Sequence, residues 1–232
     1  MNDKEIKNKI IMMCVEMFIA RHLIHKEAKE KIYEELVESE VDNVYTIKIF
    51  PMAMTLRDNL KKTIRDKTVP KGTSHAQNLD ETKEYKNYVI RLFREKLTAI
   101  SKTSGTVDFL NDHKDAHVFL ILKDAGQKVI NKIADYTNTE LLYEEEMLIN
   151  PLDHELQPEF YPFDINNKAE MTKFFKEYYC NKAQIEKLDE DSPICRFLGL
   201  KQGQLIRIIR PSEVSGKSPA YRIVKKSLQI KK

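Results

Sequence analysis

The sequence contains no tryptophan and has three cysteines, six glycines and eight prolines among its 232 residues. Cys14, Cys180 and Cys195 are odd in number and far apart, which disfavours a disulfide framework and indicates a reducing compartment. The formal net charge of +3 is too small to indicate a nucleic-acid-binding protein by itself, so any DNA contact would have to be local. With 41% hydrophobic and 32% charged residues, the composition is typical of a soluble globular protein with one large or two small domains.

A long hydrophobic run is also lacking. The most apolar stretch, "IIMMCVEMFIA" near the N-terminus, is interrupted by Glu16 and is much shorter than the roughly 20 residues that span a bilayer. Three lysines precede it as in a targeting signal, but Arg21 and His22 follow it without a small-residue cleavage site. We therefore interpret this stretch as the buried face of a helix and expect no membrane partner.

The first part of the chain predicts a mixed α and β unit. Apolar spacing predicts helices over residues 4–20, 26–38, 83–100 and 126–136, and strands over 44–50, 116–122 and 140–149. The strand, helix and strand over 116–149 have the length of a βαβ crossover, which predicts a partly parallel sheet. The residues before 116 are expected to form a polar loop. Residues 67–80 are rich in Pro, Gly and Ser, which predicts a surface loop.

The character of the sequence changes near residue 149. "NPLDHELQPEFYPFD" holds three prolines and predicts a rigid, extended connector, so we place domains at 1–148 and 149–232. A helix capped by Asn167 should follow, with an apolar stripe of Met171, Phe174, Phe175, Tyr178 and Tyr179. A short helix from Pro193 to Gly199, a strand over 204–210, a turn at "SEVSGKSP" and a returning strand "AYRIV" complete the prediction.

No catalytic or metal-binding motif stands out. The glycines of "GLKQG" lack the spacing of a phosphate loop, and Gly203 opens a strand. The pairs His22/His25 and His113/His117 have helix-face spacing but lack the further ligands that zinc needs, and no C-x-x-C occurs. Acid-x-Lys triplets occur no more often than this composition gives by chance; they begin at Glu5, Glu27, Glu81, Glu84 and Asp112. The sequence therefore predicts no catalytic residue, metal or cofactor.

The order of motifs over residues 147–224 resembles the shared fifth subunit of eukaryotic RNA polymerases, whose archaeal counterpart consists of the C-terminal half alone. The matching stretches are "MLINPLDHELQPEF" and "SPICRFLGLKQGQLIRIIRPSEVSGKSPAYRIV". Departures from the family pattern are Ser192 in place of an acid, Val214 in place of Thr and Lys217 in place of Arg. A lone "GLKQG" would carry no weight, whereas so long an ordered match does.

The resemblance implies an α+β fold with two modules. The C-terminal one is a small α+β assembly domain that docks on the largest polymerase subunit. The residues expected at that interface are those that match the family pattern: His154, Glu155, Pro158, Pro193, Arg196, Gly199, Lys201, Gly203, Arg210, Ser212, Glu213, Gly216, Tyr221 and Arg222. Gly199 and Gly203 would permit tight turns and close backbone approach, and Arg210 with Glu213 would either hold the turn by an ion pair or present a polar rim. The alternative is that the glycines and prolines only shape the hairpin.

The N-terminal half resembles the family in outline only. "AHVFLILKDAGQKVINKIADYTNTELLYEEEMLIN" follows the strand, helix and strand of the eukaryotic jaw module, a mixed sheet flanked by helices that is similar to restriction endonucleases but lacks their catalytic acids. In the family that side of the jaw faces downstream double-stranded DNA, so Lys123, Gln127 and Lys128 are candidates for weak, non-specific phosphate contacts; otherwise they are ordinary helix surface. A jaw points to a eukaryotic or eukaryotic-virus form.

The resemblance thus implies a non-catalytic subunit of a multisubunit DNA-dependent RNA polymerase, with other polymerase subunits as partners and no small-molecule substrate. The expected location is the nucleus for a cellular protein, and the virion or a cytoplasmic viral factory for a viral one. Two alternatives stay open: a stand-alone structure-specific nuclease on the jaw fold, and a free-standing DNA-binding adaptor.

Overall fold

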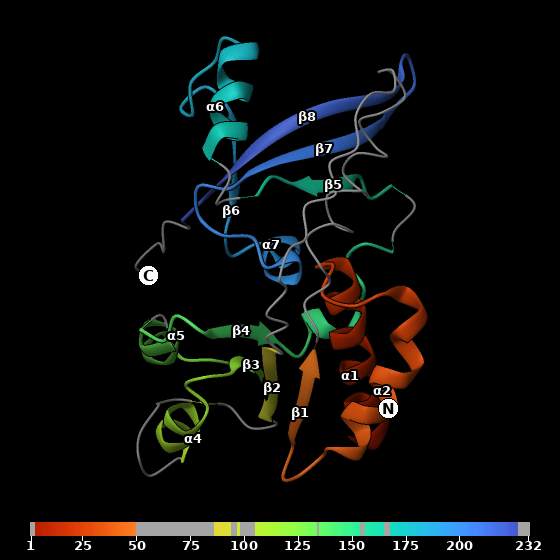
Figure 1. Cartoon of the computed structure of the whole chain (residues 1–232), viewed down its shortest axis with the longest axis vertical. Coiled ribbons are helices and arrows are strands. Elements are labelled where there is room, and N and C mark those ends of the chain that lie inside the picture. The colour runs from red at the N-terminus through yellow and green to blue at the C-terminus, as the bar shows by residue number, and fades with distance from the viewer. Residues whose placement is uncertain are drawn as a thin grey trace, which may run out of the picture. The chain divides into compact units, whose positions relative to one another are not determined.

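The computed structural model describes residues 3–49, 86–93, 97, 105–133, 135–153, 156–164 and 168–226. The chain folds as two compact units, Met1–Leu148 and Ile149–Lys232, and each combines helices with a four-stranded sheet (Figure 1). Both sheets mix parallel and antiparallel pairs, so the expected α+β class is confirmed. The predicted loop at 67–80 lies outside the described residues. None of the described helices is long and apolar enough to cross a membrane.

The sheet of the first unit has the strand order β1-β2-β3-β4. Its strands are β1 (Val44–Ile49), β2 (Lys86–Phe93), β3 (His117–Leu122) and β4 (Thr139–Tyr143). The β1–β2 pair is antiparallel, whereas β3 runs parallel to both β2 and β4. The crossover from β3 to β4 contains α5 (Gln127–Ile133), so the predicted βαβ unit is confirmed.

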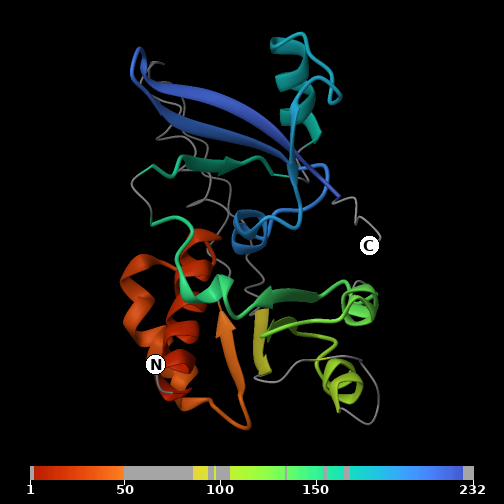
Figure 2. The same ribbon diagram turned by 180° about the vertical axis from the view of Figure 1, so that it is seen from behind.

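Helices cover both faces of this sheet. On one face, Phe18 of α1 (Asp3–Ala20) packs against Tyr88 of β2 and Phe119 of β3. A short 3₁₀ turn, η1 (Lys26–Ala28), leads into α2 (Lys29–Glu38), which packs against α1 and β1. On the other face, α4 (Thr106–Asp112) and α5 cover Val89 of β2 and three alternate residues of β3. Figures 1 and 2 show the two helix pairs on opposite sides of the strands.

The predicted helix over 83–100 is wrong, because residues 86–93 form the strand β2. The helical reading relied on Tyr85, Val89, Leu92, Phe93 and Leu97, yet "NYVIRLF" is almost continuously apolar and rich in β-branched and aromatic residues. A central strand that pairs on both edges and is covered on both faces has no alternation, so its apolar run mimics the spacing of a buried helix.

Two further boundaries differ from the sequence prediction. The expected polar loop before β3 contains the helix α4, whose buried Thr106, Phe109 and Leu110 have the i, i+3, i+4 spacing of one helix face. The strand expected over 140–149 ends at Tyr143 and is followed by η3 (Glu146–Leu148), which packs against α1 through the buried Met147. The helices over 4–20 and 26–38 are confirmed, the second beginning with the 3₁₀ turn η1.

The sheet of the second unit has the strand order β5-β7-β8-β6. Its strands are β5 (Glu159–Pro162), β6 (Glu186–Asp189), β7 (Leu205–Ser212) and β8 (Gly216–Lys225). β7 and β8 form a long antiparallel hairpin, β5 pairs with the outer edge of β7, and β6 runs parallel to β8. The sequence prediction found the hairpin but missed β5 and β6, and it gave to the turn several residues that belong to β8.

One helix packs on each face of this second sheet, as Figures 1 and 2 show. α7 (Pro193–Leu198) covers Ile206, Ile208 and Val224 through the buried Cys195. α6 (Lys168–Glu177) covers Leu205 and Ile223 through Met171 and Phe174. Successive residues of β7 and β8 therefore alternate between two separate cores, which explains why "LIRII" reads as an almost continuous apolar run.

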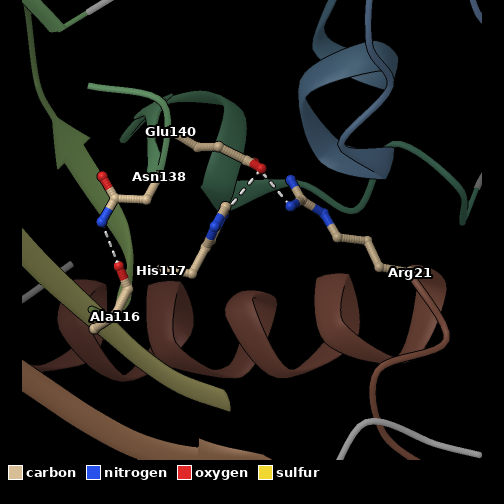
Figure 3. Close-up of polar contacts among 5 residues, drawn as sticks. All are labelled: Arg21, Ala116, His117, Asn138 and Glu140. Carbon is tan, nitrogen blue, oxygen red and sulfur yellow. Dashed lines mark hydrogen bonds and ion pairs between the residues drawn. The ribbon is translucent and has the colours of Figure 1, made fainter. Parts of the chain in front are cut away.

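A polar cluster connects α1 to the sheet of the first unit (Figure 3). Arg21, directly after α1, places its Nη1 2.8 Å from Glu140 Oε2, and His117 Nε2 lies 3.0 Å from Glu140 Oε1. The Arg21 guanidinium also lies over the ring of Phe119, 5.2 Å from its centroid, and its side chain is only 9% exposed. Glu140 thus joins three segments that are distant in the sequence.

A neighbouring amide holds the start of β3. Asn138 Nδ2 donates to the carbonyl oxygen of Ala116 at 2.6 Å and to that of Lys114 at 2.8 Å (Figure 3 draws the first). The Val118 N–H in turn donates to the Asn138 carbonyl at 2.8 Å. This exchange fixes the turn before β4 against the turn before β3, and so places His117 beside Glu140.

The charge on Glu140 should make the first unit sensitive to acid. Burial alone would raise the pKa of Glu140, but the hydrogen bond from His117 and the charge of Arg21 outweigh burial and hold that pKa at about 2, against an ordinary value of 4.5. Because the pKa of Glu140 is lower in the folded state, its ionised carboxylate stabilises that state by about 3 kcal/mol at pH values above 4.5. This contribution is lost as the pH falls toward 2. We expect Glu140→Gln to lower the free energy of unfolding by that order at neutral pH, measured by urea denaturation, and the difference from the parent to shrink as the pH falls.

Glu145→Gln is the matched control, because it removes the same charge from an exposed position. A difference between Glu140→Gln and the parent that stays constant down to the lowest pH would show that Glu140 does not act through its charge.

Candidate protein-binding surface

The first group of expected interface residues surrounds α7. Ser192 caps the helix, with its Oγ accepting from the Cys195 N–H at 3.3 Å, and Pro193 occupies the first turn. Gly199 ends the helix with φ of 63°, a left-handed conformation that favours glycine. Arg196 points away from the buried Cys195 and Phe197, and its Nη1 lies 4.0 Å from Asp191 Oδ1. The predicted limits of this short helix are confirmed.

The link from α7 to β7 depends on Gly203 and Gln204. Gly203 has φ of 82°, and its N–H donates to the Val224 carbonyl at 2.8 Å, so this amide belongs to the sheet and not to a phosphate loop. Gln204 accepts from the N–H of the exposed Lys201 at 3.1 Å and donates to the Phe163 carbonyl at 2.8 Å. A Cβ at Gly203 would meet nothing within 4 Å, so backbone angle and not close approach within this chain requires glycine there.

The second group lies on the β7–β8 hairpin, which extends beyond both neighbouring strands. Toward the hairpin tip, pairing with β5 stops at Ile209 of β7, which lies opposite Glu159. Pairing with β6 stops at Arg222 of β8, which lies opposite Glu186. The Leu205 carbonyl accepts from the Phe163 N–H, so the backbone groups of Leu205 face β5. Alternate residues of a strand direct their backbone groups to the same edge, so the backbone of Pro211 faces that side too. Pro211 therefore lacks an N–H just where β7 leaves β5. Proline on a free edge limits pairing with foreign strands.

Arg210 and Glu213, near the hairpin tip, are both exposed. Among the described residues they form no ion pair, so the expected pair that would hold the turn is absent there, and the polar rim stays a prediction. Arg210 lies opposite Ser218, and Ser212 lies opposite Gly216 at the turn. The Arg210 guanidinium is therefore available to a partner.

Ion pairs along the β6 edge hold Arg222, an expected interface residue, and Lys225, which is not in the expected set. Arg222 Nη2 lies 3.2 Å from Glu186 Oε2, and Lys225 Nζ lies 3.3 Å from Asp189 Oδ1. These pairs are partly exposed, and such pairs contribute about 0–1 kcal/mol, so a partner's carboxylate can replace them at little cost.

The expected residues do not form one patch. Arg210 is four positions along β7 from Ile206, which packs beside α7, so about 13 Å of strand separates the two residues. Arg222 lies opposite Ile206 on the α7 face, whereas Tyr221 packs against α6 on the other face. Pro158, just before β5, is half-buried, and His154 and Glu155 lie outside the described residues. A partner would have to reach around the sheet to contact every member of the set.

The expected aromatic stripe is only partly realised. Met171 and Phe174 are buried, but α6 ends at Glu177, and Tyr178 and Tyr179 are 51% and 94% exposed. Tyr179 has φ of 49°, and the Cys180 N–H returns to the Phe175 carbonyl at 3.2 Å, as in a helix end that usually carries glycine. The expected cap residue Asn167 lies outside the described residues.

Two residues that sequence reasoning missed, Tyr161 and Arg207, also lie on the α6 face, beside the expected Tyr221. Tyr161 of β5 and Tyr221 of β8 pair on either side of Arg207 of β7, so the three side chains share a face. The alternation in "LIRIIR" places Arg207 on the same face as Leu205, and this signal was available in the sequence.

The expected DNA-contacting residues are close together at one end of the first sheet. Lys123 directly follows β3, and Gln127 and Lys128 begin α5; all three are exposed. Gln127 Nε2 donates to Asn131 Oδ1 at 3.1 Å along the helix surface. Asp124 is also exposed beside them, so the local positive charge is small.

Residues that could suggest metal chemistry are dispersed. Of the acid-x-Lys triplets, Glu5 lies in α1, Glu27 in η1 and Asp112 at the end of α4, while the other two lie outside the described residues. His113 Nδ1 lies 2.9 Å from the Phe109 carbonyl, and His117 is bound to Glu140. Within the described part of the chain, no three His, Cys, Asp or Glu side chains are grouped so as to hold a metal ion.

Comparison with known proteins finds a match to the second unit. Residues 149–224 match the family of RNA polymerase Rpb5, C-terminal domain. The DNA-directed RNA polymerase subunit 5 of Acanthamoeba polyphaga mimivirus is 33% identical over 137 residues, which is 59% of this chain and 65% of that protein. The subunits RPABC1 of DNA-directed RNA polymerases I, II and III of Caenorhabditis briggsae and Caenorhabditis elegans are each 32% identical over 100 residues, 43% of this chain and 46% of theirs.

These matches confirm the resemblance to the shared fifth polymerase subunit and to a viral homologue. The match spans slightly less than two thirds of the viral relative and about half of the nematode ones.

The backbone at Tyr179 generates a prediction about stability. A residue with a Cβ in the left-handed region costs about 1 kcal/mol relative to glycine, and the ring of Tyr179 is almost wholly in solvent. Tyr179→Gly should therefore raise the free energy of unfolding by about 1 kcal/mol in a denaturant titration. Tyr179→Ala retains the Cβ and should change it little; equal effects of the two substitutions would mean that the backbone at this position is not strained.

Proposed function

We propose that this chain is a non-catalytic subunit of a multisubunit DNA-dependent RNA polymerase, anchored to the largest subunit through its C-terminal unit. The match of residues 149–224 to the Rpb5 C-terminal domain carries this proposal, because it covers almost the whole second unit. The names of the viral and nematode relatives support it. Other polymerase subunits are then the partners, and the chemistry of nucleotidyl transfer belongs to them.

The surface of the second unit suits such an anchor. Arg210 is exposed and unpaired among the described residues, and Arg222 is held only by a partly exposed ion pair. Arginine is enriched at protein interfaces because its planar guanidinium pairs with carboxylates at fixed geometry. Pro211 keeps the protruding hairpin from pairing with strands at random, so recognition rests on side chains.

The first unit is proposed as the lower jaw near downstream DNA. Its mixed sheet between two pairs of helices is compatible with a restriction-endonuclease-like jaw, and Lys123, Gln127 and Lys128 are the residues through which it would contact phosphates. Three residues, of which two are charged, give weak contacts without base preference. By analogy with the relatives, the protein would act in a nucleus or, if viral, in the virion or a cytoplasmic viral factory.

Loss of the two arginines tests the anchor. Arg210→Ala combined with Arg222→Ala should reduce co-purification of the largest subunit with the tagged full-length chain by about tenfold, since truncation of interface arginines commonly costs more than 1 kcal/mol each. Lys9→Ala with Lys114→Ala removes the same charge from exposed positions of the first unit and should leave co-purification unchanged. Co-purification that is equal in both double variants would contradict the interface assigned to these arginines.

A stand-alone nuclease is the alternative that a simple assay addresses. The isolated chain incubated with branched and linear DNA in Mg²⁺ or Mn²⁺ should leave both substrates intact if it is a non-catalytic subunit. Metal-dependent cleavage that tracks with the purified chain would overturn the proposal.

A further inference from the structure

A row of three side chains crosses the α6 face of the second sheet. Tyr161 of β5, Arg207 of β7 and Tyr221 of β8 are direct neighbours in register, so their side chains stand side by side. We call these three residues the tyrosine–arginine row. Tyr178, just after α6, adds a third hydroxyl, because its Oη lies 2.9 Å from that of Tyr221.

Arg207 is incompletely satisfied by the residues that the structure describes. Its Nε is buried and has no hydrogen-bond partner, and its guanidinium forms no ion pair with any residue that the structure describes. An acid on this face, Glu159, is already occupied: its Oε2 accepts from the Tyr161 hydroxyl at 2.6 Å, and its Oε1 lies 2.8 Å from Lys217 Nζ. A partly buried guanidinium without a counter-charge is costly, so it is a place where an external anion gains most.

The positions of the hydroxyls relative to this charge support a single site. Burial raises the pKa of Tyr221 to about 12, helped by the hydrogen bond between its hydroxyl and that of Tyr178, and the charge of Arg207 opposes that rise. Arg207 likewise opposes the rise in the pKa of Tyr161 that its hydrogen bond to Glu159 causes. The guanidinium therefore lies near both rings, and the Tyr178–Tyr221 pair, whose hydrogen bond uses only one of its two hydroxyl protons, can donate the other to an anion beside Arg207.

The surroundings are apolar and open. α6 covers the part of this face formed by Leu205 and Ile223, where Phe174 packs against Tyr178 and Tyr221 at centroid distances of 4.6 and 4.7 Å. Toward the hairpin tip the face continues with Ile209 and the exposed Pro219, which pair with each other. A charged group flanked by half-buried aromatic rings and aliphatic side chains is a common composition of a protein interface.

We propose that the tyrosine–arginine row is a docking surface for an acidic segment of a partner protein, whose carboxylate pairs with Arg207 between the tyrosine hydroxyls. The inference rests on the proposed function, since the partner would be another polymerase subunit, and it adds a second contact on the opposite face of the sheet from Arg222. A nucleic-acid backbone fits less well, because phosphate binding relies on several cations. Within the tyrosine–arginine row Arg207 is the one cation, and Glu159 adds negative charge to the same face.

Site-specific cross-linking in the full-length chain tests this inference. Tyr161 is replaced by the photo-cross-linker p-benzoylphenylalanine in a tagged chain expressed in the cells that make the protein, and the cross-linked peptide is sequenced after irradiation and purification. We expect a peptide of a polymerase subunit with an Asp or Glu close to the cross-link. Arg207→Glu should lower the cross-link yield at least tenfold, and replacing the identified acid by Arg in the partner should restore it.

Two controls make the outcome decisive. Lys173→Glu makes the same charge reversal at an exposed position of α6 outside the row and should leave the yield unchanged. Circular dichroism checks that Arg207→Glu is folded, and Arg207→Gln replaces it if it is not. A peptide without a nearby acid, a cross-link to DNA, or a yield that is indifferent to Arg207 would overturn the inference.

Failure of this inference and failure of the proposed function give different results. The same purified samples are scored for polymerase subunits before cross-linking is examined. If those subunits are present but the cross-link does not depend on Arg207, only the docking surface is wrong. If they are absent, the proposed function itself is wrong.

Discussion

The pairing of β7 with β8 is the interaction on which the second unit depends. Eight residue pairs join the two strands, and their side chains alternate between a core under α7 and a core under α6. β5 and β6 add to the outer edges only at the end near these helices, so the rest of the hairpin projects with Arg210 and Glu213 near its tip. The same ladder thus builds the core and presents the side chains that other proteins can contact.

Local sequence signals predicted those elements of this unit that are specified by their own residues. Ser192, Pro193 and Gly199 mark the limits of α7 without reference to the rest of the fold, and the turn near Gly216 marks the hairpin. The strands β5 and β6 were missed because four-residue edge strands are specified by the partner strand and not by their own pattern. The strand β2 was taken for a helix because burial on both faces removes the alternation that would identify it.

The site could be predicted residue by residue but not as a surface. The family pattern named Arg210, Tyr221 and Arg222, yet only strand register shows that Tyr221 and Arg222 lie on opposite faces. Arg207 shows the converse. The alternating pattern of β7 predicts which face Arg207 lies on, but only the structure shows that its Nε has no hydrogen-bond partner. In the first unit, the contact of Glu140 with Arg21 joins residues more than a hundred positions apart, beyond the reach of any local pattern.

The central proposal is that this chain is a non-catalytic subunit of a multisubunit RNA polymerase. Affinity purification of the tagged, unaltered full-length chain from its native cells, followed by identification and quantification of its companions, tests that claim most directly. The account predicts the large catalytic polymerase subunits in near-equal amounts with the tagged chain, eluting together as one very large complex. Recovery of the chain by itself, at the size of a single polypeptide, would contradict it.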